Sequence, residues 1–157
     1  MRDDIAVSRR IAAPAGQIFA ILTDPTRHQE LDGSGMLRGA ATTEPLTAVG
    51  DIFVMRMHYT AHGDYEMNNH VVEYEHARRL TWEPRVGRGH PDADSSDPGW
   101  GHRWGYDLKP DGPAATIVTE FYDCSTAPAT EREAMNDGRV WLEAMTETLN
   151  RLANLVS

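Results

Sequence analysis

The chain has 157 residues and a formal net charge of −9. This length fits one domain with a single buried core, so we expect residues 1–157 to form one domain. The acidic balance argues against nucleic acid and anionic membranes as partners, because both require clustered Lys and Arg. We therefore expect a small-molecule partner, and whether the protein forms a homodimer stays open.

Features of membrane and secreted proteins are missing from the pattern. No run approaches the roughly 20 apolar residues of a membrane span, and the first residues do not have the apolar core of a signal peptide. Cys124 is the one cysteine, so an internal disulfide is excluded. A single thiol is at home in a reducing compartment, and we expect a cytoplasmic protein without membrane insertion.

The first third of the chain predicts one strand followed by two short helices. Residues 5–12 alternate apolar and charged side chains, which is typical of a strand. Pro14 suits the first turn of a helix that continues to Leu22. A second brief helix is expected over residues 25–31, before an Asp-Gly-Ser-Gly run at residues 32–35 whose glycines tolerate positive φ.

From Met36 onward the apolar period changes from helical to two residues. Strands are predicted over residues 52–59, 65–74, 79–83, 102–108 and 116–122. Residues 85–101 are rich in Gly, Asp and Ser and predict a long loop, which is either a lid or an insertion without a role.

The end of the chain predicts one long helix over residues 130–156. Thr130 and Glu133 have the spacing of a capping box, which would start the helix there. A stripe at spacings of three and four then consists of Ala134, Gly138, Trp141, Met145, Leu149, Leu152 and Leu155. Such a helix would be roughly 40 Å long and would need a large apolar partner surface.

Several stretches resemble one superfamily. They are IAAPAGQIFAILTDPTRHQELDGSG, VVEYEHARRLTWEP, GHRWGYDLKPDG and TIVTEFYD, in this order of elements. The chain resembles the START-related superfamily, which includes polyketide cyclases, lipid-transfer proteins and the birch-pollen-allergen fold. The resemblance implies an α+β helix-grip fold, in which a curved antiparallel sheet of about seven strands wraps around the C-terminal helix and encloses a cavity. Leu31 departs from the tryptophan that many relatives carry there.

Strand parity predicts which side chains face the helix. The aromatic and sulfur-containing character of this set suits a flat or hydrophobic ligand, although the same residues could fill a solid core. The predicted ligand-binding residues are Phe53, Met55, Met57, Tyr59, Met67, Asn69, Trp82, Trp104 and Tyr106 on the sheet, with Trp141 and Met145 on the helix.

The polar residues of this face are candidates for catalysis. His102 shares the parity of Trp104, while Glu73 and Asn69 share that of Met67. Both faces of the last strand are equally apolar, and the resemblance to the superfamily implies that Glu120 and Tyr122 point inward. A carboxylate buried near an imidazole can act as a general base, so His102 and Glu120 are the predicted catalytic residues. The alternative is that they are hydrogen-bonded structural partners or lie at the solvent-exposed rim of the cavity.

Three functions follow from this pattern. The first is binding of a hydrophobic or aromatic, lipid- or polyketide-like small molecule; the second is a cofactor-free polyketide cyclase or dehydratase; the third is a co-chaperone-like interaction module. We expect no cofactor and no metal, because the run containing His90, Asp92, Asp94 and Asp97 lacks the glycine and distal glutamate of a calcium loop.

Overall fold

The computed structural model describes residues 4–91 and 101–156. Its centre is a seven-stranded antiparallel sheet with the order β1-β7-β6-β5-β4-β3-β2. The strands are β1 (Asp4–Ile11), β2 (Leu37–Ala40), β3 (Ile52–Tyr59), β4 (Gly63–Glu75), β5 (Arg79–Val86), β6 (Arg103–Pro110) and β7 (Thr116–Asp123). The helices are α1 (Ala15–Leu22), η1 (Pro25–Arg27), α2 (His28–Leu31), α3 (Ala129–Ala134), η2 (Asn136–Trp141) and α4 (Leu142–Leu155).

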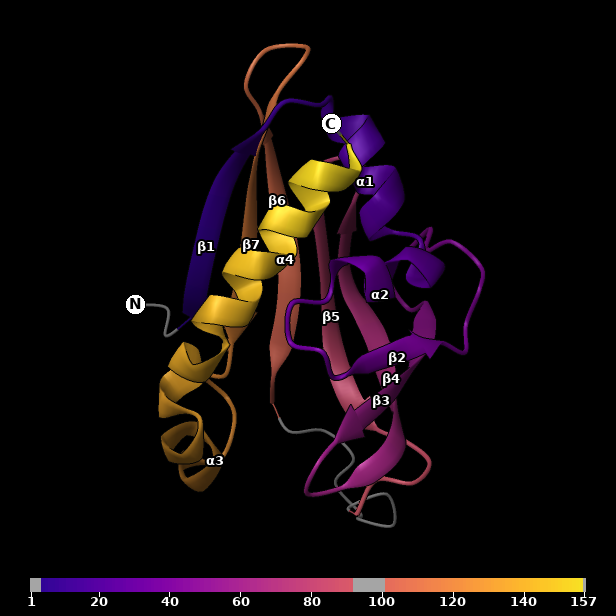
Figure 1. Ribbon diagram of the computed structural model, residues 1–157, viewed down its shortest axis with the longest axis vertical. Helices are drawn as coiled ribbons and strands as arrows, with labels where there is room; N and C mark the ends of the chain where they lie inside the picture. The colour runs from indigo at the N-terminus through magenta and orange to yellow at the C-terminus, as the bar shows by residue number, and fades with distance from the viewer. Residues whose placement is uncertain (1–3, 92–100, 157) are drawn as a thin grey trace.

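This order of elements confirms the predicted α+β helix-grip fold. The curved sheet lies behind α4, which crosses it diagonally, while α1 and α2 lie beside the C-terminal end of α4 (Figure 1). Helix α4 packs against β1, β7 and α2. Strands β2 to β5 lie to one side of α4 and extend beyond it (Figure 1).

The β3–β4 hairpin illustrates how the two-residue period sets the register. Met55 pairs with Met67, and Phe53 pairs with Asn69, so the alternating side chains of both strands meet on the same face. Phe53, Met55 and Met67 are buried on this face, and Arg56 is exposed on the other. The apolar parity of these strands therefore gives one buried wall, as predicted.

A β-bulge corrects the predicted parity of Glu73. The pairing of β4 with β5 shifts between Val71 and Glu73, and an extra residue in one strand turns the following side chains to the opposite face. Tyr74 then packs on the core through Phe19, and Glu73 forms an ion pair with Arg79 at 3.2 Å. Glu73 is thus not among the residues that face the helix.

The predicted continuous helix over residues 130–156 is wrong. The first turn begins after Pro128 without a side-chain cap, so the Thr130 capping box does not form. Asn136, Asp137 and Gly138 all have positive φ and break the chain into α3, η2 and α4. Asn, Asp and Gly are the residues that tolerate this conformation most readily. With 14 residues, α4 is about 21 Å long, half of the predicted rod.

Close packing is a second reason for a glycine at position 138. A Cβ added there would lie 2.6 Å from Cδ2 of Tyr122, so only glycine lets the backbone of the bend approach that ring. The other residues of the predicted apolar stripe differ in their burial. Ala134 is exposed, Trp141 is half-buried, and the core contains Met145, Leu149 and Leu152.

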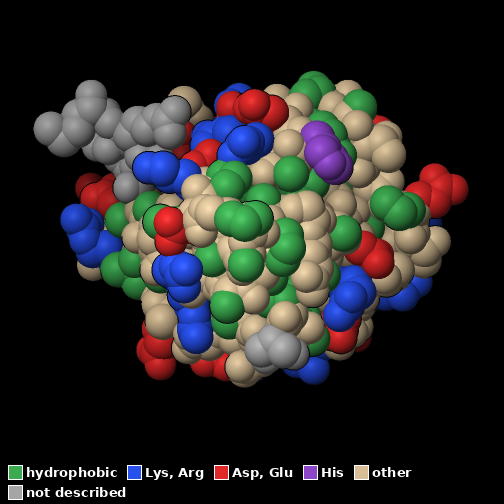
Figure 2. All heavy atoms as spheres, turned by 90° about the horizontal axis from the view of Figure 1, so that it is seen from above, with side chains coloured by type: hydrophobic (Ala, Val, Ile, Leu, Met, Phe, Trp, Pro, Cys, Tyr) green, Lys and Arg blue, Asp and Glu red, His purple; other side chains and the backbone are tan. Residues whose placement is uncertain are grey.

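The main core lies at the end of the molecule where α4 finishes. Ile18, Phe19 and Leu22 of α1 are buried there against Leu149 and Leu152. Seen from above, this end exposes apolar side chains near its centre, with acidic and basic side chains around them (Figure 2). A second buried cluster, which contains Tyr122, Cys124, Ala127 and Met145, lies toward the start of α4.

The predicted loop at residues 85–101 begins later than expected. Arg85 and Val86 still belong to β5, and Val86 pairs with Met67 of β4. Residues 92–100, which make up much of the loop predicted as either a lid or an insertion without a role, lie outside the described residues. In the part of the chain that is described, we find no helix long and apolar enough to span a membrane.

Candidate functional site

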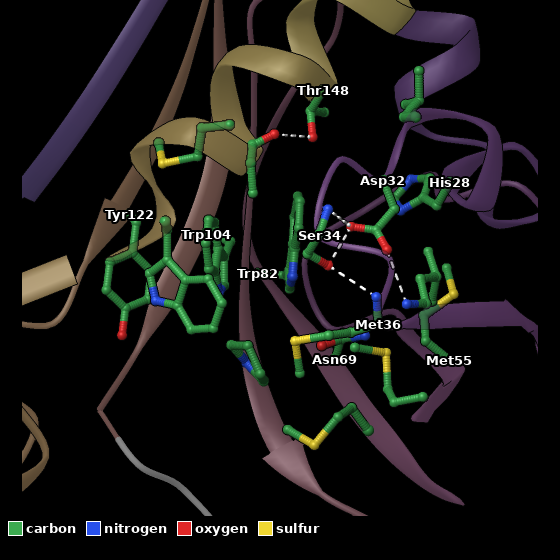
Figure 3. Close-up of a pocket in the computed structure, with 18 of the residues that line it drawn as sticks. His28, Asp32, Ser34, Met36, Met55, Asn69, Trp82, Trp104, Tyr122 and Thr148 are labelled. Atoms are coloured by element: carbon green, nitrogen blue, oxygen red, sulfur yellow. Dashed lines mark hydrogen bonds between the residues drawn. The ribbon is translucent and has the colours of Figure 1, made fainter. Parts of the chain in front are cut away.

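A pocket of about 290 Å³ lies between the sheet, the start of α4 and the segment that follows α2. Figure 3 shows side chains from all three regions directed toward one space, with Trp82, Trp104 and Tyr122 on the sheet side and Thr148 on the helix. The wall contains members of both buried clusters, so the pocket is a gap between them rather than part of either core.

Most of the residues predicted for the site line this pocket. They are Phe53, Met55, Met57, Met67, Asn69, Trp82, Trp104, Tyr106, Tyr122, Trp141 and Met145, together with His102 and Glu120. The placement of Tyr59 is wrong: its side chain is 46% exposed and contacts the ring of His62 at the end of the hairpin. Parity puts Tyr59 on the correct face, but β3 ends there, beyond the reach of the pocket.

Parity could not identify the residues that come from helices and loops. The segment from α2 to β2 contributes His28, Leu31, Asp32, Ser34, Met36 and Leu37. Further lining residues are Tyr65, Pro84, Met135, Ala144 and Thr148. Helical spacing could have identified two of these residues, because His28 and Leu31 are three residues apart and share one side of a helix. Leu31, which was noted above as a departure from the superfamily pattern, is 2% exposed.

His28 is a buried imidazole between aromatic rings. Its Nε2 lies 2.7 Å from the carbonyl oxygen of Leu22, and its ring centroid is 5.5 Å from that of Phe53 and 6.0 Å from that of Trp82. Burial lowers the pKa of His28, since the charged imidazolium would lose its hydration. His28 is therefore a neutral group of the wall at physiological pH.

Asp32 organises the loop that closes one side of the pocket. One carboxylate oxygen accepts hydrogen bonds from the backbone N–H of Ser34 at 2.9 Å and its hydroxyl at 2.6 Å. The other oxygen accepts from the N–H of Leu37 at 2.9 Å (Figure 3). The adjacent Gly33 N–H donates to Thr148 Oγ1 at 3.0 Å, which ties the loop to α4. Both oxygens of Asp32 thus have donors from the protein itself.

His102 and Tyr122 form a polar cluster at the start of β6. His102 Nδ1 is hydrogen-bonded to the Tyr122 hydroxyl, and Nε2 lies 3.5 Å from Glu131 of α3. Burial lowers the pKa of His102, and the charge of Glu131 opposes this shift. The Tyr122 hydroxyl also lies 3.5 Å from Met135 Sδ. Burial raises the pKa of Tyr122. The cluster connects the sheet to the bent C-terminal segment.

Glu120 is the most unusual group of the pocket. It is 7% exposed, and its Oε2 is buried without a hydrogen-bond partner among the described residues. Loss of hydration, and then the negative charge of Asp32, raise the pKa of Glu120 from 4.5 to about 8. Its cross-strand neighbour on β6 is Tyr106, whose pKa is raised by burial and by the charges of Glu120 and Asp32.

The structure corrects the prediction that His102 and Glu120 form one polar end. His102 has Tyr122 and Glu131 as partners, whereas Glu120 is opposite Tyr106. His102 precedes Tyr106 by four residues, about 13 Å along a strand, so the imidazole and the carboxyl group belong to different parts of the wall. The two side chains therefore share one face of the sheet but lie at different positions along its strands.

The described residues do not include a group of three or more His, Cys, Asp or Glu that could hold a metal ion. His90 is buried against the rings of His62 and Tyr65. The other members of the acidic run, Asp92, Asp94 and Asp97, lie outside the described residues.

Comparison with known sequences finds relatives in Mycobacterium tuberculosis. The chain is 33% identical over 125 residues to the uncharacterized protein Rv0088 of strain ATCC 25618 / H37Rv, across 80% of this chain and 49% of that protein. The uncharacterized protein MT0096 of strain CDC 1551 / Oshkosh is 34% identical over the same length, with the same shares covered. The chain spans about half the length of these curated relatives. No family model matches the chain.

Solved structures with the same architecture cover nearly the whole chain. A protein from Arthrobacter aurescens has a TM-score of 0.70 at 14% identity, covering 98% of this chain and 85% of that one. Protein NE0264 from Nitrosomonas europaea has a TM-score of 0.69 at 16% identity, covering 97% and 92%. The Polyketide_cyc-like protein Cgl2372 from Corynebacterium glutamicum has a TM-score of 0.52 at 23% identity, covering 99% and 83%. Identities this low establish the fold alone, and the chain shares the helix-grip architecture of these structures.

Proposed function

We propose that this protein binds a hydrophobic or aromatic small molecule, of lipid- or polyketide-like character, in the pocket between sheet and α4. The observation that carries this proposal is the composition of the wall, in which methionine and aromatic side chains from β3, β4, β5, β6 and α4 surround a few separate polar groups. Aromatic rings provide broad apolar contact area, and methionine adapts to irregular shapes. Ligand sites in proteins typically combine these two features.

The size of the pocket limits the ligand. About 290 Å³ is near the lower limit of roughly 300 Å³ for small-molecule sites. A rigid ligand of about 15 non-hydrogen atoms, each contributing about 0.5 kcal/mol, would bind with roughly 7 kcal/mol, which corresponds to a micromolar Kd. We therefore expect a compact ligand of two or three fused rings rather than a long acyl chain.

A pocket-filling variant tests this proposal. Ala144 lines the pocket, and Thr146 is exposed on the same helix. Titration with 1-aminoanthracene, whose fluorescence rises in apolar surroundings, should give saturable binding to the wild type and to Thr146→Leu. Ala144→Leu should weaken that binding at least tenfold, because the added methyl groups occupy the ligand's space. Equal binding by both variants would place the probe elsewhere and contradict the proposal.

The second candidate function is a cofactor-free polyketide cyclase or dehydratase, and the environment of Glu120 favours it. A general base works best with a pKa near the working pH, and the pKa of Glu120 is about 8. In such an enzyme Glu120→Gln should lower turnover about 10² to 10⁴-fold and leave binding nearly unchanged. In a carrier, the same change should alter affinity alone.

Mass spectrometry of extracted small molecules separates the two candidates. Wild-type protein and Glu120→Gln would be purified from the same cells and extracted. A carrier should yield the same compound from both proteins. A cyclase that eliminates water should yield a product from the wild type and, from the variant, a precursor heavier by one water. The pocket supports both candidates over the interaction module, for which we would expect a solid core with an exposed apolar patch.

A further inference from the structure

We propose that the ligand carries a neutral hydrogen-bond acceptor, such as a ketone, ester or quinone carbonyl, which accepts hydrogen bonds from the carboxylic acid of Glu120 and the phenol of Tyr106. This inference rests on the proposed function and specifies the chemical class of the ligand. It makes Glu120 a donor in the bound state rather than a counter-ion.

The geometry brings the two groups together. Tyr106 and Glu120 are directly opposite each other on β6 and β7 and line the pocket from the same face. Side chains so placed have Cβ atoms about 5 Å apart, so both hydroxyl groups can reach one ligand atom. The Tyr106 side chain is 5% exposed, and no hydrogen bond joins its hydroxyl to another described residue. Its hydroxyl is not one of the fully buried atoms without a partner, so it is accessible from the pocket, where a ligand can accept its hydrogen bond.

The protonation state follows from the surroundings of Glu120. Its Oε2 has no partner among the described residues, and no basic side chain lines the pocket near it apart from imidazoles. With a pKa of about 8, Glu120 is mainly a neutral acid at pH 6 to 7. The other titratable groups of the pocket wall are His28, Asp32, Tyr65, His102, Tyr106 and Tyr122.

The surroundings of Asp32 favour a ligand without a net charge. Its two oxygens already accept three hydrogen bonds from Ser34 and Leu37, so it does not require a cationic ligand. Its negative charge would repel an anionic ligand, just as it disfavours ionised Glu120. A neutral acceptor avoids this repulsion and accepts hydrogen bonds from the hydroxyl groups of Glu120 and Tyr106.

Four naphthalene probes of similar size test the proposal at pH 6. They are 2-acetylnaphthalene, 2-ethylnaphthalene, 2-naphthoate and 2-naphthylmethylammonium, and calorimetric titration measures each Kd. We expect 2-acetylnaphthalene to bind roughly 5- to 10-fold more tightly than 2-ethylnaphthalene, as one or two net hydrogen bonds would give. Both ions should bind more weakly than the ketone.

Three variants assign the effect to its residues. Tyr106→Phe should reduce the preference for the ketone, whereas Tyr59→Phe, at an exposed tyrosine outside the pocket wall, should retain it. In the wild type, the preference should fall as the pH rises from 6 to 9 and Glu120 ionises. In Glu120→Gln, whose amide donates at every pH, it should stay constant. Circular dichroism verifies that each variant is folded.

The possible failures can be told apart. Equal binding of ketone and hydrocarbon would overturn the acceptor hypothesis and leave ligand binding intact. Tightest binding of the ammonium probe would instead assign a cation site to Asp32 and Glu120, and tightest binding of naphthoate would refute the charge argument. Failure of all four probes to bind the folded wild type would overturn the proposed function, and the acceptor hypothesis with it.

Discussion

The raised pKa of Glu120 predicts how the stability of the protein depends on pH. The unfolded chain releases this proton near pH 4.5, whereas the folded protein retains it up to about pH 8. Between these values the folded state binds more protons than the unfolded state, so the free energy of unfolding falls as the pH rises. At 1.36 kcal/mol per pKa unit, the loss is at most roughly 5 kcal/mol and is complete above about pH 8. That is a large part of the 5–15 kcal/mol typical of a domain.

Glu120→Gln isolates this contribution, because the amide is similar in shape and does not titrate. Urea unfolding at pH 5, 7 and 9 would be followed by tryptophan fluorescence for the wild type, for Glu120→Gln and for Glu133→Gln, a control on an exposed glutamate. The stability of Glu120→Gln relative to the wild type should rise by several kcal/mol from pH 5 to pH 9. Glu133→Gln should show no such trend. If both variants follow the wild type at each pH, Glu120 is not buried as a neutral acid.

Two further predictions concern packing. Leu152 is fully buried in the main core, whereas Trp141 is half-buried at the pocket. Leu152→Ala should therefore cost roughly 2–5 kcal/mol of stability. Trp141→Ala should cost less stability than the size of the side chain implies, and it should weaken the binding of 1-aminoanthracene. Equal losses of stability with unchanged binding would contradict this division. Gly138 has a φ of +94 and contacts Tyr122, so Gly138→Ala should cost about 1–3 kcal/mol, measured by urea unfolding. Gly16→Ala, in α1 with open space around it, should instead stabilise the protein by about 0.5–1 kcal/mol, and similar losses in both variants would refute the role of close packing.

The local pattern of the sequence determined the strands and the wall they form. Residues such as Phe53, Met55 and Met67 could be placed on one face because side chains alternate along a strand and the hairpin register joins equal faces. The same rule fails where the backbone departs from regularity. The bulge next to Glu73 reverses the alternation, and Tyr59, at the end of β3, lies beyond the pocket. Irregularities of this kind depend on the neighbouring strand, which a local pattern does not contain.

Only the tertiary structure decided the chemistry of the pocket. The segment from His28 to Leu37 lies far from Glu120 in sequence, yet it closes the site and brings Asp32 near that carboxyl group. The apolar stripe of residues 130–156 fits a straight helix equally well, whereas the bend at residues 136–138 places Gly138 against the ring of Tyr122, a contact with a strand that the stripe does not contain. Side-chain periodicity reports burial along one element, whereas the partner of a buried charge and the position of a bend depend on contacts between elements distant in sequence.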